Sequence, residues 1–119
     1  MLSVAKIDEK FLNESIDWEF PIPIAYGPGR INEIGSFCNK FKISNPLIVT
    51  DKGSKELPFV NRLAGLLKKS SIKSQLFYGI SPNPRDDEIN AGCIAYRKGN
   101  HDGIIAIGGG SALDGAKAI

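Results

Sequence analysis

The sequence predicts an α/β fold with a doubly wound, mostly parallel sheet and an additional N-terminal edge strand. Three observations predict this fold. Short apolar runs alternate along the chain with segments whose apolar residues recur at helical spacing. The runs contain few polar residues, as expected for strands that are covered on both faces. The last run leads directly into three successive glycines and a further helical segment.

The first elements lie in the N-terminal half. Residues Glu19–Tyr26 alternate apolar residues with others, and their two prolines confine this segment to an edge strand or an extended arm. After a Gly-Pro-Gly turn, Arg30–Phe41 should form an amphipathic helix, because one face carries apolar residues at helical spacing. These residues are Ile31, Ile34, Phe37 and Phe41. The β-branched run Leu47–Thr50 follows as a buried strand.

The second half repeats the alternation. A helix is expected from Glu56 to Lys69, with Phe59, Val60, Leu63, Leu66 and Leu67 facing inward. A strand is expected over about Ser74–Tyr78, and another over Ile104–Ile107. Between them, Asn83 can cap a helix whose first position suits Pro84, whose first turn is acidic, and which ends in Arg97, Lys98 and Gly99.

Composition restricts the class of protein. The 119 residues carry a net charge of +2 with both signs interspersed, which gives no reason to expect nucleic acid or a membrane surface as a partner. Cys38 and Cys93 are far apart and should be reduced thiols in a cytoplasmic protein. Charged residues interrupt Met1–Trp18, so no signal peptide or membrane span is expected there. The last helix is barely two turns old at Ile119, so we expect residues 1–119 to be one incomplete N-terminal domain of a longer protein.

The glycine turn Gly108–Gly110 is the strongest functional signal. Successive glycines allow positive φ and leave no Cβ between the backbone and a ligand, so main-chain N–H groups can approach a phosphate. Ser111 can cap the following helix, and Asp114 would complete a Ser-x-x-Asp capping box. The predicted result is a site rich in N–H donors at the positive end of a helix, which suits the pyrophosphate of a dinucleotide.

Two common phosphate motifs do not fit this turn. Leu113 stands where the G-x-G-x-x-G fingerprint needs its third glycine, and Ala116 stands where a P-loop needs lysine. The pattern that remains, GGGS-x-x-D-x-A-K, closely resembles that of the iron-containing (group III) alcohol dehydrogenase family, whose fold is shared with glycerol dehydrogenase and dehydroquinate synthase. The resemblance extends from about Phe20 through the glycine turn and implies a Rossmann-like cofactor domain.

Two further loops follow predicted strands and should lie beside the glycine turn. Asp51 can accept hydrogen bonds from the adenosine ribose and repel the extra phosphate of NADP, although it could equally order its own turn. Asn83 can cap a helix, and the resemblance implies that it also contacts the cofactor through the Pro82-Asn83-Pro84 loop. The predicted cofactor-binding residues are Asp51, Asn83, Gly109, Gly110, Ser111 and Asp114.

The resemblance also implies an activity. In the family, a separate helical domain holds a divalent metal, iron or zinc, and hydride passes between an alcohol or aldehyde and NAD, or less commonly NADP. No metal ligand or catalytic residue can be assigned here, so we expect the chain alone to bind cofactor without catalysis. A homodimer through the N-terminal strand region is expected. A dehydroquinate-synthase-like cyclase and a non-catalytic nucleotide-binding fragment remain alternatives. His101, the only histidine, is expected to be a loop residue with no catalytic role.

Overall fold

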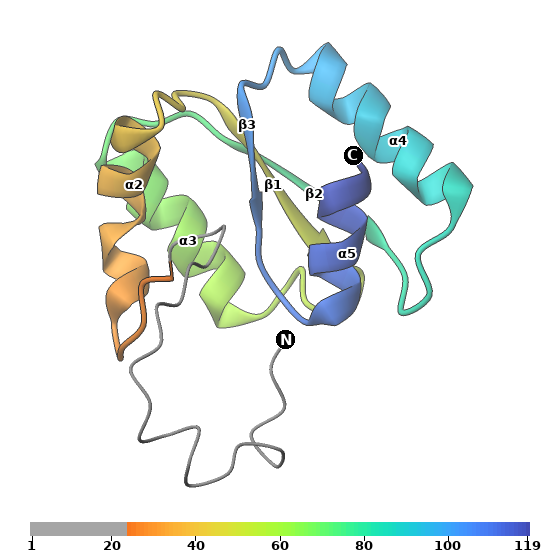
Figure 1. Ribbon diagram of the computed structural model, residues 1–119, viewed down its shortest axis with the longest axis horizontal. Coiled ribbons are helices and arrows are strands. Elements are labelled where there is room, and N and C mark those ends of the chain that lie inside the picture. Colours follow the sequence, from red (N-terminus) through yellow and green to blue (C-terminus); the bar gives the residue numbers. More distant parts are fainter. Residues whose placement is uncertain (1–23) are drawn as a thin grey trace, which may run out of the picture.

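The computed structural model describes residues 24–119, which form an α/β unit around a parallel sheet (Figure 1). The strands are β1 (Pro46–Asp51), β2 (Gln75–Ile80) and β3 (Gly103–Ala106), and their spatial order is β2-β1-β3. In the parallel register Leu47 pairs with Gln75 on one side and with Ile104 on the other. The predicted doubly wound α/β class is therefore confirmed.

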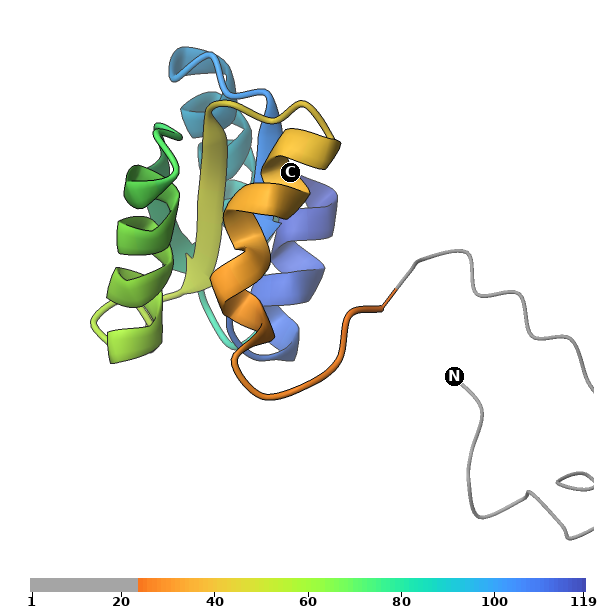
Figure 2. The ribbon, with the colours of Figure 1, turned by 90° about the vertical axis from the view of Figure 1, so that its left-hand side faces the viewer.

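Helices cover both faces of this sheet. They are the short 3-10 helix η2 (Arg30–Glu33) and the α-helices α2 (Ile34–Lys40), α3 (Pro58–Lys69), α4 (Asp86–Lys98) and α5 (Gly110–Ala118). Figure 2 shows α3 and α5 on opposite sides of β1. None of the helices within residues 24–119 has the length and apolar content that a membrane crossing requires.

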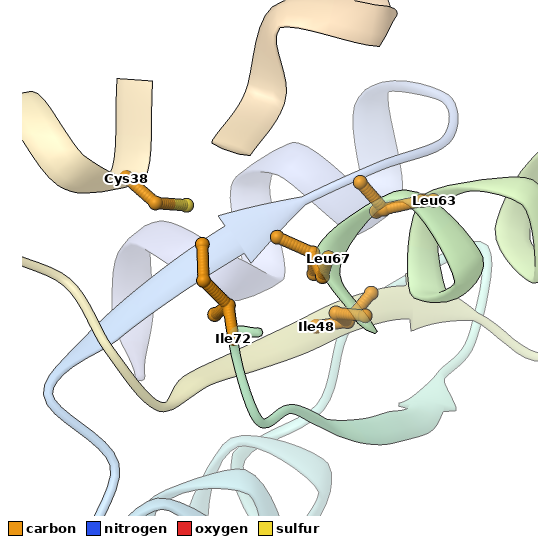
Figure 3. Close-up of a cluster of buried hydrophobic side chains, with 5 residues drawn as sticks. All are labelled: Cys38, Ile48, Leu63, Leu67 and Ile72. Carbon is orange, nitrogen blue, oxygen red and sulfur yellow. The ribbon is translucent and has the colours of Figure 1, made fainter. Parts of the chain in front are cut away.

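Strand β1 separates two apolar cores because successive side chains point to opposite faces. Ile48 joins the core beneath α2 and α3, whose other buried members are Cys38, Leu63, Leu67 and Ile72 (Figure 3). Leu47 and Val49 point the other way and pack with Ile80 and Ala116. A strand buried on both sides needs this unbroken apolar run, which is why the run predicted β1 well.

The helices near the N-terminus begin later than predicted. Arg30–Glu33 forms a 3-10 turn that starts after Gly29 at φ 73°, and only Ile34–Lys40 is α-helical. Phe41 lies past the helix end and is 60% exposed, so its predicted inward position is wrong. Helix α3 starts at Pro58 rather than Glu56, because the residue before a proline avoids helical angles and Leu57 is extended.

Two strand predictions also need correction. Strand β2 continues to Ile80 instead of ending at Tyr78, because a register irregularity opposite β1 absorbs one residue and lets pairing continue. The predicted edge strand Glu19–Tyr26 lies mostly outside the described residues, and its last three residues are not in a strand. The dimer contact proposed for that segment therefore stays a prediction.

The amino ends of the strands are fixed by polar contacts. The Asp102 carboxylate accepts hydrogen bonds from the backbone amides of Ser44 and Asn45 at 2.7 and 2.8 Å, and these bonds, chiefly the first, lower its pKa. His101 is buried, and its Nδ1 lies 2.9 Å from the Asn45 carbonyl oxygen. Both residues hold the start of β3 against the start of β1, at the end of the sheet opposite the predicted site. His101 thus lies in the loop before β3, as predicted.

Candidate functional site

The three predicted loops follow the carboxyl ends of β1, β2 and β3, toward the lower part of Figure 1. Backbone hydrogen bonds link neighbouring strands at the points where these loops begin. Lys52 N–H donates to the Ile80 carbonyl at 2.9 Å, and Ile107 N–H donates to the Val49 carbonyl at 3.0 Å. The carboxyl end of β1 therefore lies between the starts of the other two loops, as expected from the strand order β2-β1-β3.

The structure requires glycine at only one of the three positions of the turn. Gly108 has φ +135°, and a Cβ added there would lie 3.0 Å from Asp51 Oδ2 and 3.3 Å from Thr50 Oγ1. Gly109 has an ordinary extended conformation, with φ −81° and ψ −171°. A Cβ at Gly109 or Gly110 would meet nothing within 4 Å among the described atoms. Folding thus requires glycine at Gly108, while the other two positions face open space.

Helix α5 begins with uncapped amides. Its N-cap is Gly109, which has no side chain to accept a hydrogen bond. The first helical bond runs from Leu113 N–H to the Gly109 carbonyl at 3.2 Å. The amides of residues 110–112 therefore lie in the first turn, where an α-helix offers no backbone carbonyl to accept their hydrogen bonds. Such amides at the positive end of a helix dipole suit an anion.

The predicted capping box at this helix is wrong. The helix starts at Gly110, two residues earlier than the box requires, so Ser111 is the second helical residue and not the cap. The half-buried Ser111 stays beside the turn, but Asp114 is exposed one turn further along and closes no box. Ser111 could still contact an anion at the helix terminus, whereas Asp114 has lost the local role that the sequence suggested.

Asp51 is the last residue of β1 and reaches the glycine turn. Its Oδ2 accepts a hydrogen bond from the Ser54 hydroxyl at 3.0 Å, and its carbonyl accepts the Ser54 amide at 3.1 Å. These bonds show the turn-ordering role that the sequence left open. They also fix the carboxylate next to Gly108, where a ligand on the turn would meet it.

Asn83 lies in an exposed loop and does not cap α4. The helix starts at Asp86 with Arg85 as its extended N-cap, so Pro84 lies two residues before the first helical position that it was predicted to occupy. The carbonyl oxygen of Asn83 accepts a hydrogen bond from the Ser81 hydroxyl at 2.9 Å. Its side chain is thus not committed to a helix cap. The acidic first turn and basic last turn predicted for this helix are confirmed.

Glu88 is a residue of this region that sequence reasoning missed. It is 8% exposed, and its Oε1 accepts hydrogen bonds from the Ser81 hydroxyl at 2.7 Å and from the Arg85 amide at 3.0 Å. Its Oε2 lies 3.1 Å from the Lys52 ammonium. These contacts, chiefly the hydrogen bond from the Ser81 hydroxyl, favour the charged carboxylate. Burial raises the pKa of Glu88, but the contacts outweigh it and lower the pKa to about 2. The sequence signal was only an acid in a first helical turn.

Two other observations bear on what this region can bind. Thr50 is fully buried under the turn, and its hydroxyl has no hydrogen-bond partner in the described part of the chain. Within residues 24–119, no three His, Cys, Asp or Glu side chains converge as a metal site would require. The open backbone at Gly109 and Gly110 fits a phosphate group, and the described residues offer a metal no comparable set of ligands.

Comparison with known proteins identifies the family of this fold. The family model for iron-containing alcohol dehydrogenase matches residues 21–119. The chain belongs to the iron-containing alcohol dehydrogenase family. It is 36% identical over 102 residues to a choline dehydrogenase of Bacillus subtilis, covering 86% of this chain and 25% of that protein. It is 37% identical over 106 residues to NADH-dependent butanol dehydrogenase A of Clostridium acetobutylicum, covering 88% and 27%.

Solved structures agree with this family assignment. A 1,3-propanediol oxidoreductase superposes with a TM-score of 0.74 at 33% identity, over 76% of this chain and 24% of that one. A sulfoacetaldehyde reductase from Bifidobacterium kashiwanohense, solved in complex with NAD+, gives 0.72 at 30% identity, over 87% and 27%. The chain thus spans about a quarter of the length of these relatives. Family membership makes it part of an oxidoreductase family, as the sequence predicted.

Proposed function

We propose that the three loops at the carboxyl ends of the strands bind NAD, with the glycine turn holding the pyrophosphate. One observation carries the proposal: Gly109 and Gly110 need no glycine for their backbone angles or for space within the described chain. A Cβ there would instead occupy the space in front of the uncapped amides of α5. A phosphate oxygen must come within about 3 Å of such an amide to accept its hydrogen bond. Glycine keeps that approach open.

The same proposal assigns Asp51 to the adenosine ribose. A carboxylate accepts hydrogen bonds from the two ribose hydroxyls of NAD and repels the additional phosphate of NADP. Its contacts with Ser54 and its position against Gly108 would orient it before the cofactor arrives. Relatives are named as NADH-dependent and as NADPH-dependent butanol dehydrogenases, so the preference for NAD rests on the Asp51 carboxylate. Asn83, which is exposed in the adjacent loop, is the proposed third contact.

For the whole protein, we propose an alcohol dehydrogenase that transfers hydride between an alcohol or aldehyde and NAD. Bound nicotinamide supplies the hydride chemistry. The described residues would hold and orient the cofactor at the turn, at Asp51 and at Asn83. A catalytic metal, iron or zinc, would need ligands outside this set, so the 119-residue chain should bind cofactor without turning over substrate.

Titration of the purified chain with NADH, followed by fluorescence of the bound nicotinamide, tests the cofactor proposal. We expect saturable binding of NADH, weaker binding of NADPH, and competition by ADP-ribose, which carries the pyrophosphate and adenosine without nicotinamide. Absence of saturable NADH binding by a folded chain would refute the proposal for this chain. Equal affinity for NADPH would refute the role of Asp51 and leave the pyrophosphate site standing.

A further inference from the structure

The buried Glu88 carboxylate joins two loops that are distant in sequence. Glu88 lies in the first turn of α4, directly after the loop of residues 81–85 that follows β2, while Lys52 belongs to the turn that follows β1. Oε1 accepts from the Ser81 and Arg85 amides at 3.3 and 3.0 Å and from the Ser81 hydroxyl at 2.7 Å, and Oε2 lies 3.1 Å from Lys52 Nζ. The carboxylate therefore bridges the loop that carries Asn83 and the turn that carries Asp51.

Helix capping alone does not require this arrangement. An acid at the third helical position satisfies its local role once it accepts the N-cap amide, here Arg85 N–H. The contacts with Ser81 and Lys52 go beyond that role. Exposed acids elsewhere in the same turn show the difference: Asp87 is 70% exposed and pairs only locally, with Arg85 at 3.2 Å.

We infer that Glu88 is a positioning residue that clasps the Ser81–Arg85 loop to the turn after β1 and so fixes the distance between the Asn83 and Asp51 ligand groups. The inference rests on the proposed cofactor function. The Ser81 hydroxyl oxygen lies 2.7 Å from Glu88 Oε1 and 2.9 Å from the Asn83 carbonyl oxygen, so its single proton is shared between these two acceptors. The clasp thereby reaches the backbone of the proposed ligand residue. A loop held in place before binding loses less conformational entropy when the cofactor arrives.

The test uses Glu88→Gln and Lys52→Met, with Asp87→Asn as the matched control in the same helical turn. Glutamine keeps a neutral acceptor of the same shape but loses the charge, and charge-assisted hydrogen bonds are about twice as strong as neutral ones. We expect the Ser81 and Arg85 amides of Glu88→Gln to exchange hydrogen about tenfold faster, and NADH to dissociate about tenfold more readily. Lys52→Met should give a smaller change of the same sign, because that ammonium is 60% exposed.

Lys52→Arg should restore both values, since arginine keeps the cation, and Asp87→Asn should change neither. The clasp is refuted if Glu88→Gln matches Asp87→Asn in amide exchange, or if faster exchange leaves NADH affinity equal to the control. If Glu88→Gln does not fold, Lys52→Met and Lys52→Arg, which change an exposed residue, test the clasp through the same amide exchange rates and NADH affinities. If the wild-type chain does not bind NADH, the proposed function fails, and amide exchange in the free protein alone decides whether the clasp exists.

Discussion

Replacing each glycine of the turn by alanine separates folding from binding. At Gly108 the added methyl meets Asp51 Oδ2 at 3.0 Å and Ala112 Cβ at 3.1 Å, and φ is +135°. A non-glycine residue held in such a region costs about 1–3 kcal/mol, before any cost of the two contacts. At Gly109 the conformation already suits alanine, so the substitution should raise the free energy of unfolding by about 0.4–1 kcal/mol. At Gly110, inside the helix, the gain should be up to about 1 kcal/mol.

Cofactor affinity should show a different order. A methyl group at Gly109 or Gly110 blocks a phosphate oxygen from the first amides of α5, and losing one charge-assisted hydrogen bond costs about 1.5–3 kcal/mol. NADH should therefore bind about ten- to 150-fold more weakly to either variant.

Urea denaturation followed by circular dichroism gives the free energy of unfolding, and NADH fluorescence gives the dissociation constant. The reasoning is refuted if Gly109→Ala and Gly110→Ala are folded and bind NADH as tightly as wild type. It is also refuted if Gly108→Ala is as stable as wild type, because the positive φ and the close contacts at Gly108 would then not affect the free energy of unfolding.

Four further predictions concern the neighbouring side chains. Asp51→Gly should lower the preference for NADH over NADPH by about tenfold or more, because one repulsive charge is removed; unchanged discrimination in paired titrations would contradict this. Asn83→Ala should weaken NADH binding while changing the free energy of unfolding by less than about 0.5 kcal/mol, since Asn83 is exposed and caps no helix; the reverse ranking would favour a structural role. Thr50→Val should raise the free energy of unfolding by about 1 kcal/mol in urea, because it removes a buried hydroxyl without a partner among residues 24–119; a loss would show that the hydroxyl is bonded in solution. The lowered pKa of Glu88 means that its charged form is favoured by folding, so its contribution is fully present above pH 4.5 and is lost as the pH falls toward 2. Glu88→Gln should lack this part of the acid dependence, and parallel curves for the two proteins between those pH values would contradict the assignment.

Local patterns in the sequence predicted the order and class of the elements because those patterns reflect local physics. The apolar run of β1 signalled burial on both faces, and the charge distribution of α4 followed the helix dipole. Exact helix starts were harder, since several polar residues near each start could cap it. At α5 the cap is Gly109 and not Ser111, and at α4 it is Arg85 and not Asn83. Both corrections leave a polar side chain that caps no helix next to the proposed cofactor.

The irregular end of β2 shows why the clasp could not be predicted. Phe77 and Ile80 pack on the same face of the sheet although they are three residues apart, which regular alternation forbids. The register shift between Val49 and Asp51 makes this possible by absorbing one residue of β2. It also sets how far the strand runs before Ser81 leaves the sheet, and therefore which residue of α4 meets Lys52. Contacts across loops depend on such long-range register, and no spacing in the sequence encodes it.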